Sequence, residues 1–379
     1  MLHALPRSCV RRMITVSQHI RNSSSTSEVL MQVKGDKALI TLNRPKALNA
    51  LNLSMIRQIY PQLRQWENSS NIKAVIINGS GEKAFCAGGD IVAVTNAGKK
   101  KEKLAEEFFY EEYKLNNLIG SLKVPWIAFI NGITMGGGVG LSVHGTFRIC
   151  NEKTVFAMPE CGIGLFPDVG GGYFLPRLAG ETGTFLSLTG YRLKGTDVLH
   201  SGVATHFVHS KFNEELLETL VTAESGKEEL NKIFCEFQKR SEGEMKSDFS
   251  LAPHLTKINT LFNANTVEDI LKNLKEEGSD WSKKQYETIE RMSPSSLKIT
   301  LRLLREGKSL SLMDVLRIEY RLSQGCMANN DFYEGVRALL IDKDNKTSWK
   351  PAKLEDVTDD IVNSYFKALP ENRELKFDS

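Results

Sequence analysis

The sequence lacks paired cysteines, long apolar runs and a strong excess of either charge. Its six cysteines are scattered among 379 residues without a C-x-x-C pair, which argues against a zinc site or a disulfide framework. No run of about 18 apolar residues occurs, so no membrane-spanning helix is expected. The 49 basic and 46 acidic residues leave a formal net charge of +3, which gives little support to a nucleic-acid partner. The 41% of hydrophobic residues is enough for a substantial core in one large domain or two smaller ones.

The first 27 residues lack acidic side chains altogether. Residues 1–27 contain four arginines and six serines. A basic, serine-rich and acid-free N-terminus is typical of a mitochondrial transit peptide, with an ordinary unstructured tail as the alternative. We therefore expect the folded part to begin near Glu28, and we expect a location in the mitochondrial matrix.

Two apolar, strand-like runs each lead into a glycine-rich turn. Residues 73–78 precede the turn FCAGGD at 85–90, and residues 124–130 precede the turn ITMGGGVG at 133–140. Glycine lets a backbone approach a ligand closely and turn its N–H groups inward. The repetition of strand, turn and helix predicts an α/β fold with parallel strands and ligand sites at their carboxyl ends.

The rest of the chain divides into two regions that differ in amino-acid composition and in predicted secondary structure. In the first, residues 29–43 predict a hairpin, and residues 52–66 predict an amphipathic helix that Pro61 should kink or split. In the second, Glu, Lys and Leu dominate, and four segments show helical patterns: 266–275, 283–292, 295–305 and 312–327. We predict a core domain at 28–225 and a helical C-terminal region at 226–379.

The second glycine turn differs from the common phosphate-binding and nucleophile motifs. A P-loop needs Gly-Lys-Ser/Thr at its end, but Gly140 is followed by Leu141 and Ser142. Leu141 also stands at the last glycine position of a dinucleotide fingerprint. In a nucleophile elbow, His144 would have to be glycine. Ser142 and His144 are therefore expected in a helix over 139–144 and not in a catalytic triad.

A third turn supplies two carboxyl groups. Glu160 ends the stretch Met158-Pro159-Glu160, and Asp168 follows Pro167 in a glycine-containing stretch. Two backbone N–H groups aimed at one point form an oxyanion hole, and two carboxylates beside it can act as acid, base or nucleophile. The combination indicates enolate or acyl chemistry on a carbonyl compound. For Asp168, an ordinary turn former after proline is the alternative.

Taken in order, these motifs resemble those of the crotonase (enoyl-CoA hydratase/isomerase) superfamily. The matching stretches are NRPKALNAL at 43–51, KAFCAGGD at 83–90, VPWIAFING at 124–132, MGGG at 135–138 and FAMPE at 156–160. The resemblance implies an α/β fold, a crotonase-like ββα superhelix with an α-helical C-terminal region. It implies an acyl-CoA substrate, with no cofactor and no metal. It also implies that the N–H groups of Gly89 and Gly137 bind the thioester oxygen, and that Lys46, Ala47 and Ala87 contact CoA.

One position departs from the hydratases of this superfamily. Hydratases carry two catalytic glutamates, and here Glu160 matches the second while Gly140 stands in place of the first. The stretch 162–178, with 108–113, Asn116-Asn117 and 331–344, is instead similar to a branch that hydrolyses short 3-hydroxyacyl-CoA thioesters. This resemblance implies hydrolysis of 3-hydroxyisobutyryl-CoA in valine catabolism, with 3-hydroxypropionyl-CoA as a further substrate.

The same resemblance assigns roles to three acidic residues. Glu160 either attacks the thioester carbonyl or deprotonates a water molecule, and the sequence does not separate these routes. Asp168 binds the 3-hydroxyl of the substrate or positions the water and the leaving group. Glu112 resembles a substrate-binding residue, with membership of a charged helix face as the alternative.

Two other functions stay open at this stage. An isomerase or hydratase activity would use the same turns, although Gly140 argues against the hydratase. A non-catalytic crotonase-fold protein that binds RNA is the alternative from a different class, and the near-neutral charge argues against it. Leucines of the C-terminal helices, among them Leu297, Leu301 and Leu316, form either an intrachain core, which we favour, or an interface in a homo-oligomer.

Overall fold

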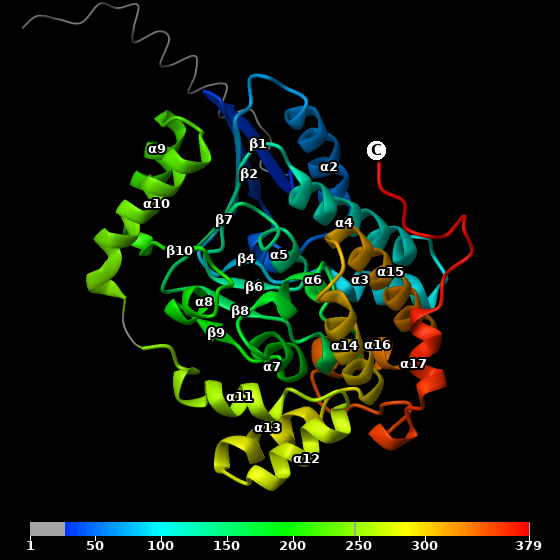
Figure 1. The fold of residues 1–379 in the computed structure, drawn as a ribbon. Helices are drawn as coiled ribbons and strands as arrows, with labels where there is room; N and C mark the ends of the chain where they lie inside the picture. Colours follow the sequence, from blue (N-terminus) through cyan, green and yellow to red (C-terminus); the bar gives the residue numbers. More distant parts are fainter. Residues whose placement is uncertain (1–26, 246–247, 379) are drawn as a thin grey trace, which may run out of the picture.

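Two β-sheets with helices around them form the architecture (Figure 1). A computed structural model describes residues 27–245 and 248–378, so the predicted transit peptide, except for Ser27, lies outside the described residues. The first sheet has the order β1 (Val29–Lys34), β2 (Lys37–Leu42), β3 (Ala74–Gly79), β5 (Trp126–Phe129), β7 (Phe147–Cys150) and β10 (His206–Phe207). The second has the order β4 (Ala84–Cys86), β6 (Ile133–Met135), β8 (Val155–Ala157) and β9 (Leu193–Lys194).

A repeated step along the chain links the two sheets. Strands β3, β5 and β7 run parallel in the first sheet, and each is followed by a strand of the second sheet, β4, β6 or β8. A helical segment follows each of these: α3 (Ile91–Lys99), α5 (Gly137–Gly140) and the 3-10 turn η2 (Glu160–Ile163). This confirms the predicted α/β class and its ββα repeat. Because β4, β6 and β8 pair in parallel, the turns at their carboxyl ends lie together.

The N-terminal hairpin forms as predicted. Strands β1 and β2 pair antiparallel from Val29 with Leu42 to Lys34 with Lys37. Gly35 sits in the turn at φ +59°, a conformation that glycine adopts without strain. Strand β2 then pairs in parallel with β3, which joins the hairpin to the large sheet and leaves β1 at its edge.

Helix α2 (Leu53–Glu67) runs through Pro61 as one helix, so a split there is wrong, while a kink at Pro61 stays a prediction. Asn52 caps the helix, because its side chain accepts a 2.9 Å hydrogen bond from the backbone of Met55. Pro61 removes one backbone hydrogen bond at a typical cost of about 3 kcal/mol, yet the helix continues through it. The buried stripe on both sides of the proline packs into the core and outweighs that cost: Ile56, Ile59, Leu63 and Trp66.

Helices dominate the second half of the chain, as predicted. The four predicted segments are α12 (Val267–Glu277), α13 (Asp280–Glu290), α14 (Pro294–Gly307) and α15 (Leu312–Ala328). Ser293 and Ser311 cap the last two through their side chains, and Pro294 is the first residue of α14. The other helices are α4 (Leu104–Ser121), α6 (Gly171–Phe174), α7 (Thr182–Thr189), α8 (Thr196–His200), α9 (Asn213–Thr222), α10 (Lys227–Ser241), α11 (Leu255–Leu261), α16 (Asp331–Val336) and α17 (Asp359–Phe366).

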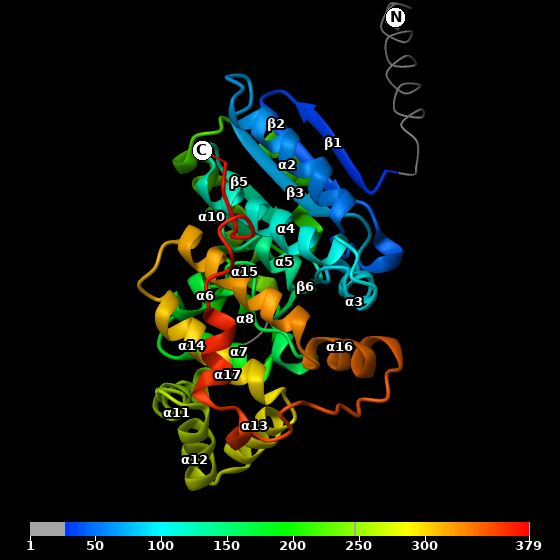
Figure 2. The same cartoon turned by 90° about the vertical axis from the view of Figure 1, so that its right-hand side faces the viewer.

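One hydrophobic core joins the two predicted regions. Its buried members run from Val29 in β1 to Leu375 near the C-terminus. Leu297, Leu301 and Leu316 are buried within the chain, which supports the intrachain role that we favoured for them. Figure 2 shows α15 lying along α4, a helix of the first region. The division near residue 225 stays a prediction.

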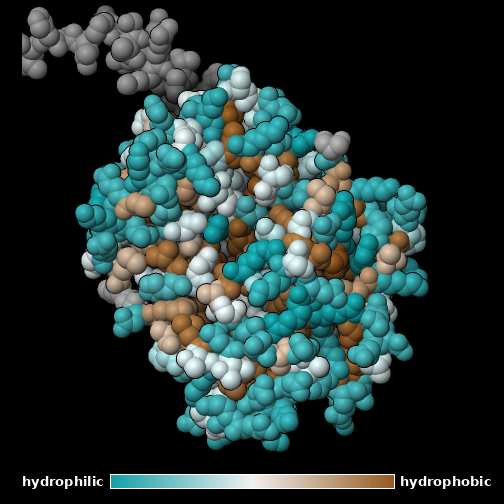
Figure 3. Space-filling model, in the orientation of Figure 1, coloured by the Kyte–Doolittle hydropathy of each residue, from teal (hydrophilic) through white to brown (hydrophobic). Residues whose placement is uncertain are grey.

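A smaller core lies on the opposite face of the large sheet. Helix α10 contributes Leu230, Phe234 and Phe237, which pack against alternate residues of the strands, such as Ile76 and Ile127. Hydrophilic side chains cover most of the face seen in Figure 3, with apolar patches between them. No helix within residues 27–245 and 248–378 is long and apolar enough to cross a membrane.

Replacing Phe234 by alanine should lower the free energy of unfolding by about 3–5 kcal/mol, because the change leaves a cavity between α10 and the sheet. Urea unfolding followed by circular dichroism measures this. The exposed Glu236 on the same helix gives a matched control, since Glu236→Ala should change the stability by less than about 0.5 kcal/mol. Equal losses in both variants would contradict the packing of α10 on the sheet.

Candidate active site

The turns after β4 and β6 place two glycine backbones against each other. Gly88 at φ +117° and Gly136 at φ +44° adopt conformations that favour glycine. A Cβ atom on Gly137 would lie 3.3 Å from the amide nitrogen of Gly89. Gly137 is the first residue of α5, where an N–H group has no acceptor inside the helix. In the described part of the chain, neither of these two N–H groups has an acceptor, so both can serve a ligand.

Glu160 begins η2, directly after β8, and its side chain turns toward these glycines. Its Oε1 atom lies 3.2 Å from the place that a Cβ atom on Gly136 would occupy. The residue is only 5% exposed, and its Oε2 atom has no hydrogen-bond partner among the described residues. Burial, and then the charge of Asp168, raises the pKa of Glu160 well above its ordinary value.

Asp168 is the second predicted carboxyl group, and it lies at the same site. It is 4% exposed, and its Oδ2 atom accepts a 2.8 Å hydrogen bond from the hydroxyl of Tyr113. Burial raises the pKa of Asp168 to about 7, although the Tyr113 hydrogen bond opposes the shift. A carboxyl group with this pKa can exchange a proton near neutral pH.

Glu112 on α4 points into the site and not onto a charged helix face. A Cβ atom on Gly137 would lie 2.6 Å from its Oε1 atom, which is buried and has no partner in the described residues. Burial raises the pKa of Glu112 well above its ordinary value, and the charges of Asp168 and Glu160 add to the effect. By contrast, its neighbour Glu111 forms an ion pair of 2.6 Å with Arg57 at the surface.

A fourth carboxyl group comes from the C-terminal region and was not predicted. Glu319 on α15 is fully buried and accepts hydrogen bonds from the backbone N–H groups of Gly170 at 2.7 Å and Gly172 at 2.9 Å. It therefore holds the turn that carries Asp168. Burial raises the pKa of Glu319 well above its ordinary value. The one signal in the sequence is an acidic residue within the apolar stripe of a predicted helix.

Two further residues at the site belong to stretches that carry the resemblance, but the sequence analysis assigned them no role. Tyr113 and Asn116 lie on α4 beside Glu112, and both are fully buried. A helical spacing of three and four residues from Glu112 would have placed Asn116 on the same face as that glutamate. The polar residues on the helix face that carries Glu112 would therefore have included Asn116.

The acidic residues have no cationic partner in the described part of the chain. No Lys or Arg side chain of residues 27–245 and 248–378 forms an ion pair with Glu112, Glu160, Asp168 or Glu319. The same residues contain no group of three or more His, Cys, Asp or Glu side chains that could hold a metal ion.

Of the predicted CoA residues, Lys46 and Ala47 lie in the 3-10 helix η1 (Pro45–Ala47), and Ala87 lies in the first glycine turn next to it. Lys46 and Ala47 are exposed, and Ala87 is half-buried. The backbone N–H of Ala87 donates to Leu48 O at 3.1 Å, and Leu51 pairs with Gly89 in an isolated bridge. Helix η1 and this turn therefore border the site on its solvent side, in reach of a ligand that enters from outside.

The structure corrects one detail of the second glycine turn. Helix α5 ends at Gly140, so Ser142 and His144 lie in the following turn and not in a helix as predicted. Ser142 donates to the carbonyl of Gly138 at 3.0 Å, and His144 Nε2 lies 2.7 Å from the carbonyl of Val169. Burial lowers the pKa of His144 to about 4. Because the two side chains bond to different backbone groups, they do not form a catalytic pair, as expected.

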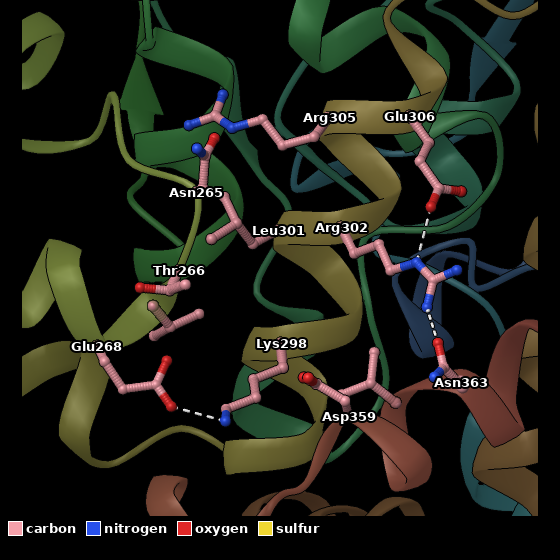
Figure 4. A pocket seen from close by; sticks show the side chains of 12 residues that line it. Asn265, Thr266, Glu268, Lys298, Leu301, Arg302, Arg305, Glu306, Asp359 and Asn363 are labelled. Carbon is pink, nitrogen blue, oxygen red and sulfur yellow. Dashed lines mark hydrogen bonds and ion pairs between the residues drawn. The ribbon is translucent and has the colours of Figure 1, made fainter.

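A separate cavity of about 500 Å³ lies between α12, α14 and α17 and contains none of these residues (Figure 4). Its basic side chains already have acidic partners: Lys298 pairs with Glu268 at 2.6 Å, Arg302 with Glu306 at 2.7 Å and Arg305 with Glu181 at 2.8 Å. These pairs leave little charge for an anionic ligand, so we assign the cavity no part in the site.

The chain belongs to the enoyl-CoA hydratase/isomerase family, whose model matches residues 37–366. It is 57% identical over 369 residues to a mitochondrial 3-hydroxyisobutyryl-CoA hydrolase of Xenopus laevis, with 96% of each chain covered. It is 54% identical over 371 residues to the human protein of that name, with 97% of this chain and 96% of the human chain covered.

Solved structures share the fold over nearly the whole chain. A carnitinyl-CoA dehydratase from Mycobacterium thermoresistibile aligns with a TM-score of 0.85 and 35% identity, covering 93% of this chain and 99% of that one. An enoyl-CoA hydratase from Rhodobacter sphaeroides aligns with a TM-score of 0.83 and 32% identity, covering 93% and 100%.

Replacing Asp168 by asparagine should remove part of the pH dependence of stability. The pKa of Asp168 is raised from 3.8 to about 7 on folding, so between these pH values the folded protein holds a proton that the unfolded chain has released. This stabilisation is complete below the unfolded pKa and is lost as the pH rises through about 7. In urea titrations from pH 4 to 7, Asp168→Asn should lose less stability than the parent. The exposed Asp359→Asn should keep the parental slope, and an unchanged slope in Asp168→Asn would contradict the assignment.

Proposed function

We propose that the chain hydrolyses the thioester of 3-hydroxyisobutyryl-CoA to 3-hydroxyisobutyrate and CoA. The observation that carries this proposal is the burial of Glu160 beside the glycine turns whose Gly89 and Gly137 N–H groups have no acceptor in the described part of the chain, with the buried Asp168 close enough for its charge to act on Glu160. Relatives at 53–57% identity carry the name of this hydrolase, whereas the dehydratase and hydratase structures are 35% and 32% identical. The protein is mitochondrial, as those relatives are, and acts in valine catabolism. A transit peptide at 1–27 and a place in the matrix stay proposals.

The substrate carbonyl is proposed to accept hydrogen bonds from the N–H groups of Gly89 and Gly137. As the carbonyl carbon becomes tetrahedral, negative charge gathers on its oxygen between these donors. Loss of one such donor typically raises the barrier by about 3–4 kcal/mol. The CoA moiety would lie along η1 and the first glycine turn, against Lys46, Ala47 and Ala87.

Two routes suit a carboxyl group in the position of Glu160. In the first, its carboxylate adds to the carbonyl carbon, the C–S bond breaks, and water then opens the mixed anhydride. In the second, Glu160 takes a proton from water while the water oxygen adds to the carbonyl carbon. In both, the CoA thiolate takes a proton, and Asp168, with its pKa near 7, is placed to supply one. We assign Glu112 to substrate binding beside Gly137.

A hydratase is the second candidate, because the enoyl-CoA hydratase and carnitinyl-CoA dehydratase structures share the fold. Position 140 argues against a hydratase activity, because Gly140 has no carboxylate. A Cβ atom there would lie 2.6 Å from Asn116 Nδ2 and 2.7 Å from the Cβ atom of Val169, so this backbone has no room for a glutamate. We also propose that the reaction needs no cofactor and no metal. Assembly into a homo-oligomer stays a prediction.

Thiol release from (S)-3-hydroxyisobutyryl-CoA tests the proposed function. The protein without residues 1–27 should release CoA rapidly, and Glu160→Gln and Asp168→Asn should each lower kcat by about 100-fold or more, because each loses a group that acts on the reacting atoms. Glu111→Gln, a change on α4 outside the site, is the control and should keep the parental rate. A folded parent that releases no thiol would refute the hydrolase, and hydration of crotonyl-CoA would then be measured.

Replacing Glu319 by glutamine should lower kcat about tenfold with little change in KM. The amide nitrogen cannot accept a backbone N–H, so one of Gly170 and Gly172 loses its acceptor and the turn that positions Asp168 loosens. Steady-state kinetics on the same substrate measures this. Glu306→Gln on α14, an exposed position, should leave both constants unchanged. Wild-type kinetics in a folded Glu319→Gln variant would refute the positioning role.

A further inference from the structure

Asn116 is a buried side chain with two polar atoms that nothing in the described chain satisfies. It is fully buried on α4, and neither its Nδ2 nor its Oδ1 atom has a hydrogen-bond partner. Buried polar groups are nearly always paired, because an unpaired one forfeits its hydration without compensation. An asparagine kept in this state therefore indicates a partner that arrives from outside the chain.

The neighbours of Asn116 place it beside the last residue of α5 and close to Val169. It follows Glu112 by one helical turn, so both side chains face α5. Glu112 lies beside Gly137, the first residue of α5, and Asn116 lies beside Gly140, its last. A Cβ atom on Gly140 would sit 2.6 Å from Asn116 Nδ2. The same atom would lie 2.7 Å from the Cβ of Val169, so Asn116 is also next to the residue that follows Asp168.

A carboxamide with a free donor and a free acceptor complements a hydroxyl group, which also donates and accepts. We propose that Asn116 binds the 3-hydroxyl of the acyl group and so determines the specificity for 3-hydroxyacyl-CoA thioesters. This inference rests on the proposed function and assigns one of its specificity contacts. It leaves the carboxyl group of Asp168, already bonded to Tyr113, for the water and the leaving group.

Discrimination follows from the cost of an unpaired amide. An acyl group without the hydroxyl would leave both polar atoms of Asn116 buried and unpaired in the complex. A site built around a substrate hydroxyl rejects analogues that lack it for this reason. The attacking water could also form hydrogen bonds with Asn116. A contact to water and a contact to the 3-hydroxyl have different effects on substrate preference. A contact to water would matter equally for every acyl group, and a contact to the 3-hydroxyl only for hydroxylated ones.

The test compares two substrates in three proteins. The ratio of kcat/KM for 3-hydroxyisobutyryl-CoA to that for isobutyryl-CoA is measured in the parent, in Asn116→Leu and in Asn117→Leu. Asn117 lies on another face of α4 and is half-buried, so it is the matched control. In Asn116→Leu the ratio should fall by about tenfold or more, mostly through slower turnover of the hydroxylated substrate. In Asn117→Leu the ratio should stay as in the parent.

A thermal unfolding measurement separates this role from a structural one. Because the amide of Asn116 has no partner inside the chain, Asn116→Leu should unfold at a temperature no lower than the parent. Asn116→Ala repeats the comparison if leucine does not fit. An unchanged substrate ratio, or an equal loss on both substrates, would overturn the inference. A parent that hydrolyses neither substrate would instead refute the proposed function.

Discussion

The burial of several carboxyl groups at one place, without a cation from the described chain, is the constraint that shapes this site. Each group loses hydration, and each charge opposes the next, so the pKa values of Glu112, Glu160 and Asp168 all rise. Two carboxyl groups, Asp168 and Glu319, have hydrogen-bond donors in place of cations, while Oε1 of Glu112 and Oε2 of Glu160 have no partner among the described residues. Tyr113 donates to Asp168, and the N–H groups of Gly170 and Gly172 donate to Glu319. Such donors stabilise an ionised carboxylate without cancelling its charge, which leaves it available for chemistry.

The parts of the site that could be predicted from sequence are those encoded locally. Each glycine turn follows a short apolar strand, and the parallel pairing of β4, β6 and β8 brings the three turns together. The glycine turns and the Met158-Pro159-Glu160 turn could thus be found from the sequence, whereas the roles of Gly89, Gly137 and Glu160 came from the family resemblance and stay proposals. The hairpin and the four C-terminal helices were predicted for the same reason, since alternation, caps and helical spacing lie within each segment.

What could not be predicted depends on contacts between distant segments. Glu319 lies nearly 150 positions from the glycines that it holds, and nothing near it marks that partnership. Asn116 looks like any polar helix residue until α5 and Val169 enclose it. Pro61 shows the opposite case, because it does not split α2, and the apolar stripe around it is buried in the core. In each case the packing of distant segments determines the surroundings of the residue, and local sequence patterns do not contain that information.

The core that runs from Val29 to Leu375 also bears on how the chain reaches its native state. Hydrogen bonds join Tyr60 of α2 to Asp378 and Tyr110 of α4 to Lys376, and contacts of such large sequence separation form slowly because a long loop must close first. A chain that emerges from its N-terminus, from a ribosome or through a membrane pore, cannot complete this core until its final segment is released. Its apolar surfaces stay uncovered during that interval, and surface of this kind is prone to aggregate.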